Sequence, residues 1–281
     1  MVLQPGQFTI RPVRPLGAGG LGTVDEVEVI ASNQSHPVGT KLARKRLGQK
    51  WASDPGARTR FEREIEMLST MRHPHVVSVA GVSLPGGERW YAMPLFPRSL
   101  RAALAQGSFL RHPVDVAGFI AKIADALSYA HSINFIHRDL KPENILLDGA
   151  NEPVVADWGL GQFVHLHSKV LDLTRGGPMG TSYYCSLEQW TTGRCEVSGD
   201  VYSLGVILAE LGAGKALPIQ PLGSGIRVDV FSGGDSVARA MNTIVRKMTL
   251  LTPAGRHRAM SEVAHALRLA AGAQFASHAQ W

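Results

Sequence analysis

The feature that most constrains the fold is a change of hydrophobic period partway along the chain. Before residue 94 apolar residues tend to alternate, as in Val24–Ile30, and a period of two is typical of a half-buried strand. After residue 99 they recur at helical spacing, as in Val114–Ile133. The change predicts an α+β fold in which a small β-rich part precedes a larger, mainly helical part, with a linker near Pro94–Arg98.

Local patterns predict the individual elements. Strands are expected over Phe8–Pro15, Val24–Ile30, Lys41–Leu47, Val76–Leu84 and Arg89–Met93. Helices are expected over Ala57–Met71, Val114–Ile133, Val197–Leu211, Val237–Leu251 and Ser261–Ala271. Two long stretches, Gln162–Thr181 and Gly212–Asp235, fit neither pattern, and such segments in a compact domain are usually functional or disordered.

Composition excludes several classes of protein. The two cysteines, Cys185 and Cys195, are too few for a disulfide framework or a cysteine-rich zinc site, so we expect a reducing, cytoplasmic compartment and inert thiols rather than redox-active ones. No signal-peptide pattern, membrane span or basic stripe interleaved with aromatics is found, so neither a membrane segment nor nucleic acid is expected. The net charge of +6 fits an anionic ligand and is equally common in ordinary soluble proteins.

A glycine-rich segment lies between the first two expected strands. Residues Gly17–Val24 follow the pattern G-x-G-x-x-G-x-V, in which glycines let the backbone approach a phosphate closely. A glycine-rich hairpin turn would have the same pattern. A dinucleotide fingerprint needs a helix after the glycines, and no G-x-x-x-x-G-K-[ST] is present, so both of those alternatives are excluded.

The segment Ile136–Asn144 concentrates more chemistry than any other. Asp139, Lys141 and Asn144 lie within one short loop, and Asp157 follows the next apolar strand. A carboxylate can deprotonate a hydroxyl, a lysine can neutralise a phosphoryl group, and amide and carboxylate oxygens can bind a metal ion. The loop therefore points to phosphoryl transfer.

These motifs together resemble a eukaryotic-type (Hanks-type) serine/threonine protein kinase catalytic domain over nearly the whole chain. The matching segments, in the family's order, are the glycine loop, Leu42–Lys45, Arg63–Ile65, His137–Asp139, Asp157–Gly159, Gly180–Thr181, Ser186–Glu188 and Asp200–Gly205. The resemblance implies a bilobal fold, with an N-lobe over about 1–93, a hinge over 94–98 and a C-lobe over 99–281. It implies a transferase of signal transduction that uses ATP and Mg²⁺, or Mn²⁺, to phosphorylate proteins. The Ala, Gly and Arg usage points to a bacterial source, and the oligomeric state is left open.

The resemblance also implies a role for each matching residue. The catalytic set is Asp139 as base, Lys141 on the γ-phosphate, Lys45 on the α- and β-phosphates, and Glu64 as the partner of Lys45. The nucleotide site would comprise Gly17, Gly19, Gly22, Val24, Ala43, Lys45, Met93 as gatekeeper, the Pro94 carbonyl and the Phe96 N–H. The metal ligands would be Asn144 and Asp157. The alternative for Glu64 is a solvated helix charge, an interpretation that fits Glu62 or Glu66 better. The alternative for Met93 is a buried core methionine, which is compatible with the gatekeeper role.

Several other residues are expected to have structural rather than catalytic roles. Strand alternation turns Ala43 and Lys45 to one face and Arg44 outward. By resemblance, Asp200 anchors the catalytic loop through backbone N–H groups, Glu188 pairs with Arg256, and Trp158 takes the place of the usual phenylalanine.

The position of Arg138 next to Asp139 implies control by an anionic partner, commonly a phosphate. We expect autophosphorylation at Ser168 or Thr174, with Thr181 contacting Asp139 and Lys141. Two alternatives stay open. The protein could be a pseudokinase scaffold, or it could be a kinase of small molecules, since such kinases share the H-x-D-x-x-x-x-N motif.

Overall fold

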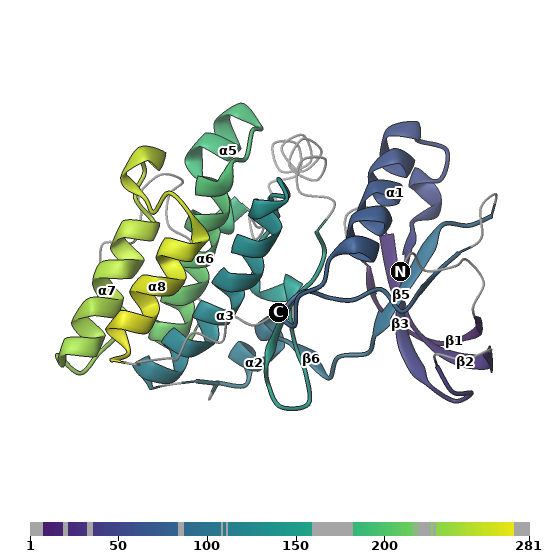
Figure 1. The fold of residues 1–281 in the computed structure, drawn as a ribbon, viewed down its shortest axis with the longest axis horizontal. Coiled ribbons are helices and arrows are strands. Elements are labelled where there is room, and N and C mark those ends of the chain that lie inside the picture. Colours follow the sequence, from purple (N-terminus) through teal and green to yellow (C-terminus); the bar gives the residue numbers. More distant parts are fainter. Residues whose placement is uncertain are drawn as a thin grey trace.

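A computed structural model describes residues 8–18, 22–32, 36–83, 87–107, 109–110, 112–158, 182–215, 217, 226 and 229–272. The β-sheet and one helix lie at one end of the molecule, and the remaining helices lie at the other (Figure 1). The α+β, bilobal arrangement expected from the sequence is confirmed.

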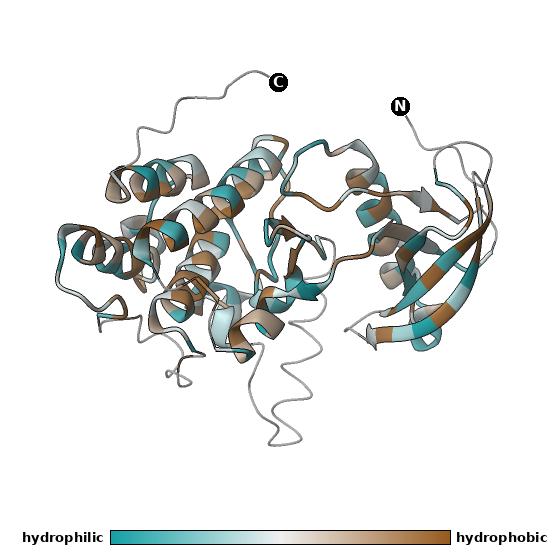
Figure 2. Cartoon of the chain, turned by 90° about the horizontal axis from the view of Figure 1, so that it is seen from below, coloured by the Kyte–Doolittle hydropathy of each residue, from teal (hydrophilic) through white to brown (hydrophobic). Residues whose placement is uncertain are grey.

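The N-terminal sheet has five antiparallel strands in the order β1-β2-β3-β5-β4. They are β1 (Phe8–Ala18), β2 (Gly22–Ser32), β3 (Lys41–Leu47), β4 (Gly81–Val82) and β5 (Trp90–Pro94). Teal and brown bands follow one another along the long ribbons of this sheet in Figure 2, in keeping with the alternation expected for Val24–Ile30. Val24 and Tyr91 lie opposite Lys45 on the neighbouring strands, and Ala43 lies opposite Met93. Cross-strand partners share a face, so the register gathers these five side chains on one side of the sheet.

Helix α1 (Pro55–Thr70) packs against the sheet. Its first turn is capped by Asp54, whose carboxylate accepts a hydrogen bond from the Ala57 N–H at 2.6 Å. The buried face holds Ala57, Phe61, Glu64, Ile65 and Leu68, a spacing of one helical turn. A glutamate on this face is forced into the interior.

The expected strand over Val76–Leu84 is mostly wrong. Only β4 pairs with the N-terminal sheet, whereas Val76 forms an isolated bridge with Val155 in the C-terminal part. The Val77 N–H donates to the Val155 carbonyl at 2.9 Å, and the Val155 N–H donates to the His75 carbonyl at 2.9 Å. The apolar run is extended, but its first half finds its backbone partners in the other lobe.

The expectation that Arg44 faces outward is also corrected. Arg44 does lie on the face opposite Lys45, yet it is only 9% exposed. Its guanidinium donates to both carboxylate oxygens of Asp25, at 3.1 and 2.5 Å. Alternation predicted the correct face, but the paired carboxylate on β2 keeps the arginine on the sheet.

The C-terminal part is built around α6 (Val197–Ala213), which is buried from Gly199 to Leu211. Helices α3 (Pro113–Ser132), α7 (Ser236–Met248) and α8 (Met260–Ala270) pack on it, while α2 (Leu100–Ala105) and α5 (Leu187–Thr192) are short. The expected long helices are confirmed to within a few residues at each end, and the two short ones were not foreseen. Among the described residues, no helix is both long and apolar enough to span a bilayer.

A second, three-stranded sheet with the order β6-β7-β8 lies beside the helices. It consists of β6 (Arg98–Ser99), β7 (Ile145–Leu147) and β8 (Pro153–Val155). Elsewhere in the described chain, short 3₁₀ turns are found at Gln49–Trp51, Pro142–Asn144, Ser182–Tyr184 and Pro253–Gly255. Polar residues just before β7 (Asp139, Lys141 and Asn144) and just after β8 (Asp157) lie across a cavity from the N-terminal sheet.

The expected pair between Glu188 and Arg256 is present. The guanidinium of Arg256 donates to both oxygens of Glu188, at 2.6 and 3.0 Å, and also to the backbone carbonyls of Ser198, Leu250 and Leu251. The Arg256 side chain is fully buried and that of Glu188 is 25% exposed. This one arginine joins α5, α6 and the turn before α8.

We predict that Glu188→Gln lowers the free energy of unfolding at pH 7 by about 2 kcal/mol, because a charged hydrogen bond to a buried guanidinium is lost. Burial alone would raise the pKa of Glu188, but hydrogen bonding to Arg256 lowers it below its usual value of 4.5. The contribution is therefore complete above that value and is lost as the pH falls through the lowered pKa. Denaturant unfolding at pH 7 and pH 3.5 measures this, with the exposed Glu66→Gln as control. An equal difference at both pH values would contradict it.

Candidate active site

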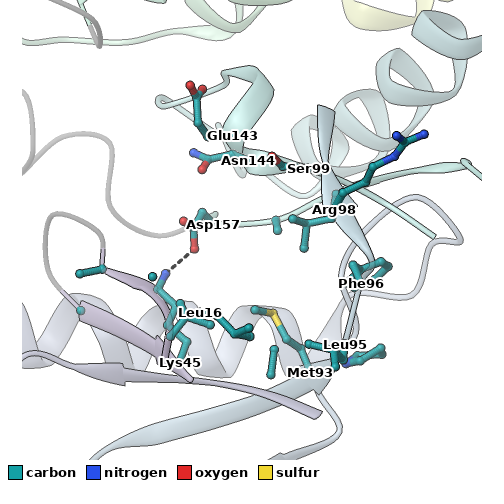
Figure 3. A pocket seen from close by; sticks show the side chains of 18 of the residues that line it. Leu16, Lys45, Met93, Leu95, Phe96, Arg98, Ser99, Glu143, Asn144 and Asp157 are labelled. Atoms are coloured by element: carbon teal, nitrogen blue, oxygen red, sulfur yellow. Dashed lines mark hydrogen bonds and ion pairs between the residues drawn. The ribbon is translucent and has the colours of Figure 1, made fainter. Parts of the chain in front are cut away.

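A cavity of about 900 Å³ lies between the N-terminal sheet and the loops of the second sheet. Its side chains come from both parts of the chain, and Figure 3 shows Lys45 reaching across it toward Asp157. The lining includes the expected residues Gly17, Gly22, Val24, Ala43, Lys45, Met93, Pro94, Phe96, Asp139, Lys141, Asn144 and Asp157. One cavity therefore gathers residues separated by more than a hundred positions in the sequence.

The wall formed by β1 and β2 carries the glycines. A Cβ atom on Gly22 would lie 2.4 Å from the Arg46 carbonyl oxygen, so no other residue fits there without moving the backbone. Gly17 faces open space, since a Cβ atom at that position would meet no other atom within 4 Å. Gly19 lies outside the described residues. At these two positions the backbone itself borders the cavity.

The segment after β5 forms the inner edge of the cavity. Met93 is 6% exposed and belongs to the hydrophobic core as well as to the lining, so the core and gatekeeper interpretations are compatible. Leu95 and Phe96 follow it along the same edge (Figure 3). This edge presents backbone groups and apolar side chains to the cavity.

Lys45 is the charged centre of the site. Its ammonium donates to Glu64 Oε1 at 2.8 Å and to Asp157 Oδ1 at 2.7 Å. Burial alone would lower the pKa of Lys45, but the carboxylates of Asp157 and Glu64 raise it well above its usual value. Burial would likewise raise the pKa of Asp157, but the Lys45 ammonium lowers it. Each group therefore holds the other in its charged form.

The loop between α3 and β7 places three polar side chains on the opposite wall. The Lys141 ammonium donates to Asp139 Oδ2 at 2.8 Å. The Asn144 side-chain amide donates to the Asp139 carbonyl at 2.8 Å and to Asp139 Oδ2 at 3.2 Å. Both bonds use the amide nitrogen of Asn144, which leaves its oxygen available to the cavity.

A buried aspartate on α6 holds this loop in place, as expected. Asp200 is 1% exposed and accepts hydrogen bonds from the His137 N–H at 2.8 Å and the Arg138 N–H at 2.9 Å. Its Oδ2 also lies 2.9 Å from His131 Nε2. Arg138 has a φ of +68° and Asp157 a φ of +61°, and such left-handed conformations cost about 1–3 kcal/mol each for residues other than glycine. The hydrogen bond from the Arg138 N–H to Asp200 helps to hold Arg138 in this left-handed conformation.

Trp158, next to Asp157, is 1% exposed. Its indole Nε1 donates to the Val155 carbonyl at 3.0 Å, and its ring packs 4.9 Å from that of His137. The indole is therefore tightly packed and makes a hydrogen bond that phenylalanine could not make.

The cavity contains residues that sequence reasoning missed. They are Arg14, Leu16, Ala18, Leu95, Pro97, Arg98, Ser99, Glu143, Leu146 and Ala156. Leu146 could have been found, because alternation along β7 buries Ile145 and Leu147 on one face and turns Leu146 to the other. Arg98 carried no such signal, since its stem lines the cavity while its guanidinium bonds outside, to Gln106 and Asn151. Five other expected positions, Gly159, Ser168, Thr174, Gly180 and Thr181, lie outside the described residues.

The donor set suits a divalent cation bound together with phosphates. Asp157 offers a partly exposed carboxylate and Asn144 an amide oxygen, and both line the same cavity. Mg²⁺ prefers such hard oxygen ligands and typically takes one or two from the protein, completing its shell with phosphate oxygens and water. Asp157 and Asn144 therefore fit a bound Mg²⁺ ion.

Comparison with known proteins agrees with this geometry. The family profile described as "Protein kinase domain" matches residues 10–264. Among similar proteins, serine/threonine-protein kinase PknE of Mycobacterium bovis is 29% identical over 207 residues, covering 74% of this chain and 35% of that protein. Receptor-like kinase TMK2 of Arabidopsis thaliana is 33% identical over 235 residues (78% and 24%), and serine/threonine-protein kinase PrkC of Bacillus subtilis is 28% identical over 210 residues (75% and 31%).

The chain belongs to the protein kinase domain family. Members of this family are transferases that use ATP and a divalent metal. PknE and PrkC are named as serine/threonine-protein kinases. The chain spans about a third or less of the length of these curated relatives.

We predict that Trp158→Phe makes the Asp157–Trp158 segment easier to displace, because the bond to the Val155 carbonyl is lost. Inhibitors that require this segment to flip should bind the variant about fivefold more tightly, in keeping with one buried hydrogen bond. Calorimetric affinities for such an inhibitor measure the change, with Trp51→Phe, outside the cavity, as control. Equal affinity for wild type and Trp158→Phe would refute the prediction.

Proposed function

We propose that the protein transfers the γ-phosphoryl group of ATP to serine and threonine hydroxyls of protein substrates. The observation that carries the proposal is the cavity in which the Lys45–Asp157 ion pair faces the hydrogen-bonded set of Asp139, Lys141 and Asn144. The names of PknE and PrkC state this specificity for those proteins, and the position of Lys141, two residues after Asp139, supports it here.

In this proposal the nucleotide base lies between Val24 and Ala43 on one side and Leu146 on the other. The Pro94 carbonyl accepts from the base, since proline lacks only the N–H, and Phe96 supplies the N–H donor. The phosphates extend beneath Gly17, Gly19 and Gly22 toward Lys45. The apolar end and the charged end of the cavity match the two ends of ATP.

For the chemical step, the Asp139 carboxylate takes the proton of the substrate hydroxyl as the hydroxyl oxygen bonds to the γ-phosphorus. The bond between that phosphorus and the bridging oxygen breaks, and ADP leaves. Lys141 neutralises charge on the transferring group, and Lys45 does so on the α- and β-phosphates. Asn144 and Asp157 would hold Mg²⁺, or Mn²⁺, which neutralises the phosphate charge when bound.

We assign residues 1–93 to the N-lobe, 94–98 to the hinge and 99–281 to the C-lobe. We further propose a cytoplasmic setting and protein rather than nucleic-acid partners.

We also propose that the protein phosphorylates itself at Ser168 or Thr174, and that Arg138 binds the phosphate.

We predict that Asp139→Asn lowers phosphotransfer by a factor of about 10² to 10⁴, the range typical of a lost general base. Radiolabelled ATP with a protein acceptor measures this, and Asp115→Asn, on the first turn of α3, is the matched control with unchanged activity. An acceptor panel with aminoglycosides and sugars tests the alternative substrate class. Wild-type turnover retained in Asp139→Asn, or transfer to small molecules only, would contradict the proposal.

We also predict that wild type incubated with ATP and Mg²⁺ gains phosphate between Asp157 and Glu188, whereas Asp139→Asn does not. Mass spectrometry of the proteolysed chain locates the modified residue. Finding no phosphate in this segment of an otherwise active enzyme would refute autophosphorylation there.

A further inference from the structure

A tyrosine hydroxyl is buried beside the Lys45–Glu64 pair. Tyr91 lies on β5, has no exposed surface, and donates its hydroxyl hydrogen to Glu64 Oε1 at 2.9 Å. The same oxygen accepts the Lys45 ammonium at 2.8 Å, while Glu64 Oε2 is buried with no hydrogen-bond partner among the described residues. One oxygen of Glu64 therefore receives both of the bonds that hold the carboxylate.

The ring of Tyr91 contacts both partners as well. It lies directly opposite Lys45 across the β3–β5 register, with the ammonium 5.8 Å from the ring centre. It also packs on Phe61, one helical turn before Glu64 on α1, at a ring separation of 5.8 Å. Tyr91 thus connects the sheet to the buried face of α1 independently of Lys45.

The hydroxyl has a function separate from the ring. Phenylalanine would fill the same volume, and a buried hydroxyl without a partner costs free energy. Burial, and then the negative charge of Glu64, raise the pKa of the Tyr91 phenol well above its usual value. The hydroxyl therefore stays protonated and remains a hydrogen-bond donor to the carboxylate.

We propose that Tyr91 is a positioning residue that holds Glu64, and with it α1, in place for Lys45. The inference rests on the proposed function, in which Lys45 turns to the phosphates of ATP. When Lys45 shares its hydrogen bonds with phosphate oxygens, its hold on Glu64 weakens. Tyr91, which is not among the residues that line the cavity, then keeps the carboxylate fixed, and Glu64 in turn fixes Lys45.

We predict that Tyr91→Phe lowers kcat/KM for ATP about tenfold, the effect of one lost hydrogen bond to a buried charged group. Tyr129→Phe is the matched control, because its hydroxyl accepts the Arg72 N–H at 3.0 Å away from the cavity. The control should keep the wild-type kcat/KM even if it lowers the melting temperature. Should Tyr91→Phe fail to fold, Tyr91→Met removes the hydroxyl in a second way and carries the same expectation.

A double-mutant cycle separates positioning from general stability. In a Glu64→Leu background the Tyr91 hydroxyl has no carboxylate to bind, so adding Tyr91→Phe should cost less than about twofold in kcat/KM. The same tenfold loss in both backgrounds, or no loss in wild type, would overturn the inference. Absence of phosphotransfer by wild type itself would instead refute the proposed function, so the two failures are distinguishable.

Discussion

The charge on Lys45 is the constraint on which the site depends. A buried ammonium is stable only with anionic partners, and here they come from α1 and from the segment after β8. The pairs with Glu64 and Asp157 therefore fix a helix of the N-terminal part and a loop of the C-terminal part relative to one strand. Lys45 thereby connects these elements across the cavity.

The opposite wall is held by a second buried charge. Asp200 is fixed within the most buried helix, and its two oxygens accept backbone N–H groups of the loop that carries Asp139. Hydrogen bonds to a carboxylate are about twice as strong as neutral ones, which suits a loop with a left-handed Arg138. A rigid helix thus positions the loop that carries Asp139.

Much of the fold and of the candidate site could be predicted because the signals are local. Alternation placed Ala43 and Lys45 on one face, whereas the pairing of Glu64 with Lys45 was expected from the family resemblance. What failed depended on distant partners. The backbone of Val76–Val77 bonds to β8, and Arg44 is retained by Asp25; neither sequence segment records its partner. The bond from Tyr91 to Glu64 has the same origin, since β5 and α1 meet only in the folded chain.

The central claim is that the cavity binds ATP through Lys45. Calorimetric titration of wild type and Lys45→Met with ATP–Mg²⁺ and with adenosine tests it most directly. The account predicts that the substitution weakens ATP binding by about tenfold or more, because a phosphate ligand is lost, while adenosine affinity stays within about twofold. Unchanged ATP affinity in Lys45→Met, with adenosine bound as before, would contradict the claim.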